Sequence, residues 1–502
     1  MKKSLVIAVL AFIISFTLKA QVGVSGHFYG EDAFKFSQYK NYGTARTAGM
    51  GGAFTALGGD ASNTFVNPAG LGFYNRSEFS ISPSFNSSST TTNYLGQSAI
   101  RNSSNSSIGN VSVIFNGKSR GQSKMKSSFG ISYNNLVNFH NEFDYQGDNN
   151  ASSIQDYFAE QATFRGANSS TLDSEFDPVT GIADTPEAMY YQAYMIDPYE
   201  NGYVVVEPSF PVSQSGRVSE QGNLGQLNLS YGANIQDKTY LGVSVGLQSL
   251  NYNSINRHDE SFPNGEVFNA FANQDELVVR GTGVNLSIGM IYRITDDVRF
   301  GLNVTTPTAL RTSETFYSAI NIDQKPNTFQ TDFQTIEVVP GEFDYRITTP
   351  LRANAGLGYV LPGKIGVISA EAEYVGYGGM NVNNKQSQAW SSEQNRGIED
   401  YYKDVINLKG GAEFRFGKVR VRGGVNYLAD PYVSDNGLNR SSLILSGGAG
   451  FRSARFFADA SYSATSFDTA YSPYVLSVPE NFDTAVTANR SGILTFTVGT
   501  FF

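Results

Sequence analysis

The sequence predicts an all-β protein, a fourteen-stranded antiparallel transmembrane β-barrel with an N-terminal hatch, or plug, in its lumen. Three observations predict this fold. Charged residues make up only 16% of the 502 residues, while aromatic residues reach 13%. Apolar residues alternate with polar or small ones over many segments, and the connections between these segments are alternately short and long. A mean hydropathy of -0.25 excludes a bundle of membrane helices but suits strands that face lipid on one side and a polar lumen on the other.

The first twenty residues predict a signal peptide. Lys2 and Lys3 precede an apolar run from Leu5 to Leu18, and Ala20 offers a small residue at the cleavage point. A run of about 14 apolar residues is shorter than the roughly 20 that a membrane-spanning helix needs. We therefore expect three parts, namely a signal peptide over 1–20, a hatch over 21–76 and a transmembrane β-barrel over 77–502.

The strands are predicted from alternation with a period of two, which places one set of side chains on one face. The clearest hairpin has apolar residues at every second position from Val284 to Tyr292 and again from Val298 to Val304, with a Thr-Asp-Asp turn between them. Segments of this kind are expected near 78–85, 108–116, 127–136, 224–234, 240–252, 280–292, 298–305, 347–360, 365–375, 405–416, 419–428, 441–451, 455–463 and 490–502.

The connections between these strands predict an orientation in a bacterial outer membrane. Short turns such as 235–239 and 293–297 alternate with long loops, of which 137–223 is the longest. Outer-membrane barrels keep their long loops outside the cell and their short turns in the periplasm. By resemblance to other such barrels, a last strand that ends on Phe502 is what the barrel-assembly machinery recognises. Assembly machinery and outer-membrane lipid are therefore expected partners.

Residues 43–72 are too rich in small side chains for a membrane strand, and they precede the first one. Gly49, Gly51 and Gly52 superficially suggest a loop that holds phosphate, but no strand leads into them and no βαβ unit follows. The alternative is a compact plug whose glycines permit close packing inside a crowded lumen.

Three motifs in this segment resemble the hatch of the FadL/TodX family of outer-membrane transport proteins. They are Arg-Thr-Ala-Gly-Met-Gly-Gly-Ala-Phe-Thr-Ala from Arg46, the pair Asp60-Ala61, and Asn67-Pro68-Ala69-Gly70-Leu71. The resemblance continues at 349–352, 355–359, 410–414 and 422–424, so it covers most of the chain after residue 20.

The resemblance implies a fourteen-stranded plugged barrel that passes small hydrophobic molecules, such as long-chain fatty acids or aromatic hydrocarbons, passively through an apolar interior. It also implies release through a gap in the wall, which a kink in the third strand opens and which Asn67, Pro68 and Ala69 of the hatch face. Alternation in the third strand breaks at Asn134 and Asn135. This break is either the kink or an ordinary strand end.

The loop 137–223 contains the only convincing helix signals that the sequence offers. Its apolar and aromatic residues fall close to helical spacing in two stretches, and Thr185 and Pro186 predict the start of the second. These faces either capture a hydrophobic ligand outside the membrane or pack against each other, and they contain Tyr157, Phe158, Met189, Tyr190, Tyr194 and Met195. The Ser-, Asn- and Thr-rich run 87–107 is expected to be a solvated, mobile loop.

The composition argues against other classes of protein. The chain has no cysteine and three histidines that form no ligand pair, so we expect no metal site, no cofactor, no catalytic residues and no enzyme activity. Asp60 and Glu413 are each alone in their motifs and are interpreted as structural. A net charge of -9 makes nucleic acid an unsuitable partner. The alternative to a transporter is a FadL-like barrel that serves as a docking or shuttle component of protein secretion.

Overall fold

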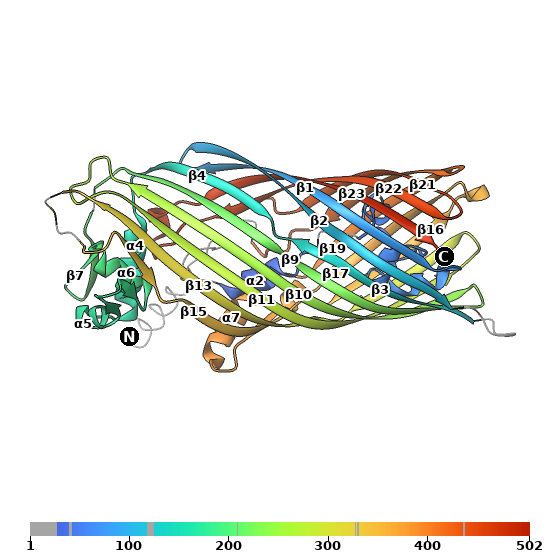
Figure 1. The fold of residues 1–502 in the computed structure, drawn as a ribbon, viewed down its shortest axis with the longest axis horizontal. Coiled ribbons are helices and arrows are strands. Elements are labelled where there is room, and N and C mark those ends of the chain that lie inside the picture. Colours follow the sequence, from blue (N-terminus) through green and yellow to red (C-terminus); the bar gives the residue numbers. More distant parts are fainter. Residues whose placement is uncertain are drawn as a thin grey trace, which may run out of the picture.

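The computed structural model describes residues 28–39, 43–117, 125–207, 209–326, 328, 331–434 and 437–502. The predicted signal peptide lies outside these residues. Within them, one long antiparallel sheet closes on itself because β1 (Glu78–Tyr94) pairs with β2 (Gln97–Gly117) on one side and with β23 (Ala485–Phe501) on the other. Figure 1 shows the resulting barrel, which is much longer than it is wide.

The described wall has fourteen spans, which confirms the predicted fold class. Beyond the three strands above, seven spans are single strands, β9 (Val212–Ile235), β10 (Thr239–Ser261), β11 (Phe268–Arg293), β19 (Val405–Phe416), β20 (Val419–Leu428), β21 (Ser442–Arg452) and β22 (Phe456–Tyr471). The other four are broken in two, β3 (Met125–Asn138) with β4 (Asn141–Asn149), β12 (Val298–Thr305) with β13 (Ala309–Gln324), β15 (Gly341–Thr348) with β16 (Arg352–Val360), and β17 (Gly366–Val375) with β18 (Asn381–Asn383).

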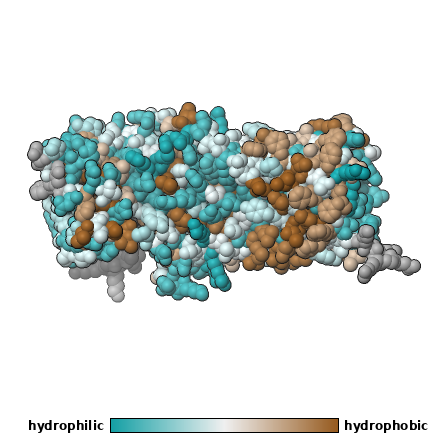
Figure 2. Space-filling model, in the orientation of Figure 1, coloured by the Kyte–Doolittle hydropathy of each residue, from teal (hydrophilic) through white to brown (hydrophobic). Residues whose placement is uncertain are grey.

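Alternation along the strands produces a lipid-facing belt. On β10, for example, Leu241, Val243 and Val245 are 38–44% exposed, while Ser244 between them is buried toward the lumen. Apolar outward-facing residues of this kind recur on neighbouring strands at the same level. Figure 2 shows them as a brown band over the half of the barrel that carries the short turns, whereas the other half is mostly hydrophilic. Only the half of each long span next to the short turns is therefore built for contact with hydrocarbon.

The run 87–107 was predicted to be a mobile loop, and this prediction is wrong. It forms the outer parts of β1 and β2, which remain paired up to Tyr94 and Gln97. The polar side chains pair across the hairpin, for instance Ser88 with Ser103 at 2.7 Å between their hydroxyl oxygens. A strand outside the membrane has no need of an apolar face, so hydropathy alternation cannot reveal it. β4 and the start of β9 likewise extend into the predicted loop 137–223.

Helices and short strands close the outer end of the barrel. They are α4 (Ile154–Arg165), α5 (Ser169–Ser174), α6 (Pro186–Gln192), β5 (Phe176–Asp177), β6 (Ile182–Ala183), β7 (Ile196–Tyr199), β8 (Gly202–Val205) and β14 (Thr335–Val338). A further helix, α7 (Gln388–Tyr401), lies in the loop between β18 and β19, where no helix was predicted. Short 3-10 turns occur at η3 (Pro362–Lys364), η4 (Tyr377–Gly379) and η5 (Pro479–Asn481).

The described residues before β1, 28–39 and 43–77, lie inside or at the end of the barrel. They form α2 (Tyr29–Lys35), α3 (Ala45–Ala48), η1 (Ala61–Thr64) and η2 (Pro68–Phe73). In Figure 1, α2 lies near the middle of the barrel, and the dark blue segment that follows it lies near the end with the short turns. We call residues 43–74 the hatch segment. No helix within the described part of the chain is long and apolar enough to cross a membrane.

Candidate functional site

The hatch segment packs directly on glycines of the wall. A Cβ atom added to Gly51, whose φ is +65°, would lie 2.8 Å from the backbone nitrogen of Val425. On the wall side, a Cβ on Gly424 would lie 2.2 Å from the nitrogen of Gly51. Gly49 is in ordinary contact with the wall, with its Cβ position 3.5 Å from the Cα of Gly448, and Gly52 has a positive φ of +77°. These contacts let two backbones approach as closely as only glycine allows.

The Asn67-Pro68-Ala69 triplet fixes η2 to the wall. The Asn67 side chain caps η2 by accepting a hydrogen bond from the nitrogen of Ala69 at 3.1 Å, and it donates to the carbonyls of Thr55 at 2.7 Å and Leu302 at 3.2 Å. Pro68 lies against Gly242 of β10, where an added Cβ would come within 2.1 Å of the Pro68 carbonyl carbon. The triplet thus contacts β10 and its neighbours. Thr64 and Leu71 of the hatch touch the third span: the Thr64 hydroxyl bonds that of Ser132 at 2.6 Å, and a Cβ added to Gly130 would lie 3.4 Å from Cδ1 of Leu71.

Asp60 organises the hatch from within. Its Oδ1 caps η1 by accepting from the nitrogen of Ser62 at 3.0 Å, and it also accepts from the Thr44 hydroxyl at 2.7 Å. Arg46 approaches Asp60 to 4.0 Å, and its Nε donates to Glu413 of β19 at 2.9 Å. The Asp60 carboxylate is thus a structural cap, as its motif suggested.

Buried charges hold the hatch against the wall. Glu413 accepts from Arg46 and from Arg422 of β20, both at 2.9 Å, and Arg422 continues to Asp459 at 2.6 Å. The side chains of Glu413 and Arg422 are each 2% exposed. Removal of one charge from such a set costs several kcal/mol because its partner is left buried and unpaired. The hatch is therefore a firmly anchored seal.

A second set of buried charges binds the backbone in the middle of the hatch. Glu371 of β17 accepts from the backbone nitrogens of Phe54 at 3.1 Å and Thr55 at 3.0 Å. Lys409 links Glu371 at 3.0 Å to Glu373 at 3.2 Å. The Glu371 carboxylate replaces the water that the hatch amides would otherwise bind.

Beyond the hatch lies an apolar layer that we call the lumen chamber. It is formed by side chains that point inward from the wall, and α2 occupies its middle. Phe34 stacks on Tyr402 with 4.8 Å between ring centroids, and Phe36 contacts both Phe139 and Tyr252 at 5.5 Å. The buried residues of the wall and its connections that form the chamber are Leu136, Val137, Phe139, Leu224, Leu250, Tyr252, Val279, Leu310, Tyr345, Ile347, Val375, Tyr377, Met380, Val382, Ile398 of α7, Tyr402 and Val405.

The third span is bulged next to the predicted break. Asn134 and Asn135 pair with Gln226 and Gly225 of β9, and the register then shifts before Val137. Leu136 is the extra residue of this bulge. Because alternation is interrupted, Asn135, Leu136 and Val137 are all buried in succession, and the last two belong to the lumen chamber. The bulge therefore directs apolar side chains inward at a level where the wall would otherwise present polar ones.

The bulge coincides with a break in the wall that we call the seam. The ladder between β2 and β3 runs from Gly117 only as far as Asn110, which pairs with Asn134. Among the described residues no ladder pairs join 97–109 to 135–149, and β4 pairs with β9 instead. The seam begins within the belt, because Ile108 on its edge is 48% exposed.

Side chains close the seam. At the last ladder pair, the side-chain nitrogen of Asn110 donates to the side-chain oxygen of Asn134 at 2.7 Å. Beyond it, across the seam, the side chains of Asn105 and Asn138 bond each other at 3.1 Å. Farther out, Arg101 pairs with Glu142 at 2.9 Å and is itself 31% exposed. Each amide contact of this kind contributes about 1 kcal/mol, and an exposed ion pair contributes less.

The outer cap buries most of the residues that were considered for ligand capture. Tyr157, Phe158, Met189, Tyr190 and Met195 are 0–5% exposed in one cluster formed by α4, α6 and the outer ends of β11 and β13. Phe158 and Tyr190 stack with their centroids 3.8 Å apart. Tyr194 is 41% exposed. In this closed form, the two helical faces pack against each other and against the rim.

Beneath the cap lies a buried polar cluster. Glu260 accepts from the nitrogen of Ile154 at 2.9 Å and lies 3.0 Å from His258, whose other ring nitrogen is 2.8 Å from the hydroxyl of Tyr145. Asp156 forms the capping box of α4 with Ser153. Burial, opposed by the hydrogen bond from Ser153 and reinforced by Glu260, raises the pKa of Asp156 to about 6.

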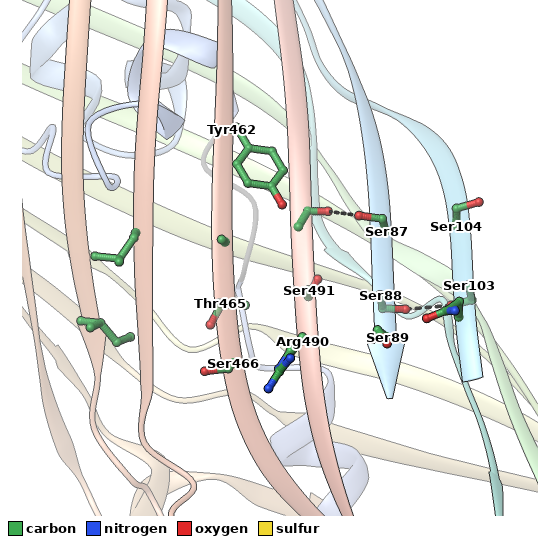
Figure 3. A pocket seen from close by; sticks show the side chains of 15 residues that line it. Ser87, Ser88, Ser89, Ser103, Ser104, Tyr462, Thr465, Ser466, Arg490 and Ser491 are labelled. Atoms are coloured by element: carbon green, nitrogen blue, oxygen red, sulfur yellow. Dashed lines mark hydrogen bonds between the residues drawn. The ribbon is translucent and has the colours of Figure 1, made fainter. Parts of the chain in front are cut away.

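An open groove of about 790 Å³ lies on the outer face of the wall. Figure 3 shows it crossing β21, β22, β23, β1 and β2, with Tyr462 and Arg490 beside a row of serines. Tyr462 is 53% exposed while Ser461 beside it is buried toward the lumen, so the groove faces outward. It is therefore separate from the lumen chamber, which α2 fills.

Sequence reasoning missed the residues that line the chamber. Phe36, Phe139 and Tyr252 lie in three distant segments, and each sits among polar residues without a motif of its own. Within the described residues no cluster of His, Cys, Asp and Glu could hold a metal ion.

Comparison with known proteins supports this architecture. No family model matches the sequence, and no curated protein matches it significantly. Among solved structures, a Pseudomonas aeruginosa FadL homologue matches with a TM-score of 0.56 and 11% identity, over 92% of this chain and 99% of that one. The Pseudomonas putida toluene transporter TodX matches with a TM-score of 0.53 and 11% identity, over 93% of this chain and 99% of that one.

At these identities the likeness concerns the fold. The closed antiparallel barrel with an apolar belt is the β architecture of bacterial outer membranes, so the chain is an outer-membrane barrel. The resemblance first seen in the hatch motifs is confirmed at this level, and the chain has the fold of the FadL/TodX family of outer-membrane proteins.

Proposed function

We propose that the protein is a passive outer-membrane channel for small hydrophobic compounds, with long-chain fatty acids among its cargo. One observation carries this proposal, namely an apolar lumen chamber that lies directly behind a seam in the wall at the level of the outer part of the belt. The solved relatives named as transporters, TodX for toluene among them, favour a channel over an enzyme.

The chemistry of the chamber suits an apolar chain or ring. Its walls supply aromatic and branched aliphatic side chains, as is typical of sites that bury small ligands. The polar groups among them are paired, for example Lys35 with Glu220 at 2.6 Å and with the Tyr252 hydroxyl at 2.8 Å. The hatch closes the axial route on one side and the cap closes it on the other. A hydrophobic molecule that enters the chamber therefore leaves most easily through the seam, where it meets lipid rather than water.

The seam is tested by bridging it with a short bifunctional thiol reagent in a variant carrying Asn105→Cys and Asn138→Cys. The native chain has no cysteine, so the two thiols are unique. The matched control is Ser88→Cys with Ser103→Cys, because these residues face each other across an intact ladder. Uptake of a radiolabelled long-chain fatty acid is measured in a double-membrane bacterium that lacks its own importer.

We expect that bridging the seam lowers uptake at least tenfold and that bridging the control pair leaves it unchanged. Unchanged uptake through a bridged seam would assign the exit to another route. If the unbridged barrel restores neither fatty-acid nor toluene uptake, although it is folded in the membrane, the cargo is not hydrophobic. The role in protein secretion should then be tested.

A further inference from the structure

Three arginines stand together on the outer face of the wall. Arg280 of β11, Arg311 of β13 and Arg346 of β15 are all exposed, and they lie on neighbouring spans. Arg311 and Arg346 are direct cross-strand partners, and Arg280 lies diagonally from Arg311, whose own partner on β11 is Thr282. Side chains directly opposite on one face have Cβ atoms about 5 Å apart, and diagonal neighbours about 7–8 Å. We call these residues the arginine patch.

None of the three guanidinium groups forms an ion pair with a described carboxylate. Asp344 also faces outward nearby, two positions from Arg346 and diagonal to Arg311, because its cross-strand partner is Ser313. Like charges directly opposite each other on a sheet are destabilising. One neighbouring carboxylate leaves the three arginines with a net positive charge.

A second arginine pair on the same wall has its own counter-charges. Arg217 of β9 is the direct partner of Arg257 of β10, so the same like-charge pairing occurs there. In that pair each arginine has its own carboxylate, Asp144 at 2.7 Å and Asp259 at 2.8 Å. The contrast indicates that the arginine patch is balanced by an anion from outside the chain.

The height of the patch identifies the anion. Val284, which is 55% exposed, is the last apolar residue of the belt on β11, and Arg280 lies four positions beyond it. Four residues of strand correspond to about 13 Å, or about 10 Å of height at the usual tilt of barrel strands. This is the level of the lipid headgroups on the side of the long loops. Flexible arginine side chains reach toward such a boundary while their charges stay among polar groups.

We propose that the arginine patch binds the phosphate groups of a phosphorylated lipid of the outer leaflet. Guanidinium groups hold phosphate with paired hydrogen bonds, and three of them on adjacent strands match a headgroup that carries more than one phosphate. The acyl chains of the same lipid lie along the belt below. The inference depends on the membrane orientation of the barrel but not on what the channel transports.

The test is native mass spectrometry of the purified full-length barrel with added lipid A, which carries two phosphates, and with its dephosphorylated form. We expect the native barrel to retain lipid A at least tenfold better than the dephosphorylated lipid. Arg311→Gln with Arg346→Gln should lower lipid A retention at least tenfold. Arg257→Gln, at the neutralised pair, should leave it unchanged.

Three other results would contradict the proposal. Equal retention of the two lipids by the native barrel overturns it without any variant, which covers the case in which the double variant does not fold. Equal retention by the folded double variant also overturns it. Displacement of lipid A by millimolar inorganic phosphate would assign the patch to free anions instead of lipid.

Discussion

Substitution Glu413→Gln should release the hatch segment without unfolding the barrel. Glu413 accepts hydrogen bonds from Arg46 of the hatch and Arg422 of the wall, both at 2.9 Å, in a site where its side chain is 2% exposed. Glutamine keeps the shape but removes the charge. Arg422 retains Asp459 at 2.6 Å. Arg46 keeps the carbonyl of Gly59 at 3.1 Å, the Phe54 ring and Asp60 at 4.0 Å, but no close carboxylate. Loss of one member of a buried ion set costs about 3–5 kcal/mol.

The loss falls on the docking of the hatch, so its local opening should increase by about two to four orders of magnitude. Hydrogen exchange of residues 44–73 measures this opening, and heat-modifiable migration verifies that the barrel is intact. The control is Arg415→Gln, since Arg415 contacts the same carboxylate at 3.3 Å but is 37% exposed and should contribute less than about 1 kcal/mol. Unchanged protection of the hatch in Glu413→Gln, or an equal loss of protection in the control, would show that the charge of Glu413 does not anchor the hatch.

Three further changes test the cap, the chamber and the glycine contacts. Burial raises the pKa of Asp156 to about 6, so the protonated carboxyl stabilises the cap fully below about pH 4, and this stability is lost as the pH rises through 6. The hydrogen-exchange protection factors of α4 should therefore fall by up to roughly 100-fold over that range. The substitution Asp156→Asn should remove this pH dependence. Phe36→Ala weakens the packing of α2 in the chamber by about 3–5 kcal/mol, so a fluorescent fatty acid that displaces α2 should bind at least tenfold more tightly, whereas an unchanged Kd would contradict such displacement. Gly424→Val places a side chain 2.2 Å from the nitrogen of Gly51 and should expose the hatch to protease, whereas Gly423→Val, with open space around its Cβ position, should not.

The membrane part of the fold could be predicted because lipid imposes a strict pattern on the sequence. The predicted bounds 298–305, 405–416 and 419–428 are those of β12, β19 and β20. Outside the belt this constraint disappears. The outer halves of β1 and β2 are mostly polar on both faces. α7 is amphipathic, but two of its three buried residues, Ser391 and Gln394, are polar, so hydropathy alone does not separate it from a loop.

The candidate site was only partly predictable for a related reason. Asn134 and Asn135 interrupt an alternation, and such a defect is visible in sequence, which is why the bulge next to them could be suspected. The lumen chamber is different, because its aromatic residues come together only when distant spans close into a barrel. Phe36 in particular meets Phe139 and Tyr252 through tertiary packing alone.

The contacts that hold the seam are weaker than those that hold the hatch. This difference favours passage of a ligand through the wall over passage along the barrel axis. Movement of the hatch requires the separation of Arg46 from Glu413 and of the hatch amides from Glu371, and each buried charge left alone costs about 3–5 kcal/mol. Opening of the seam breaks the amide contact between Asn105 and Asn138 and the two partly exposed ion pairs of Arg101, with Glu142 and Asp144. Their combined cost is about 1–3 kcal/mol. A ligand that gains even a few kcal/mol from the chamber can therefore open the seam by differential binding, whereas the same gain leaves the anchored hatch in place.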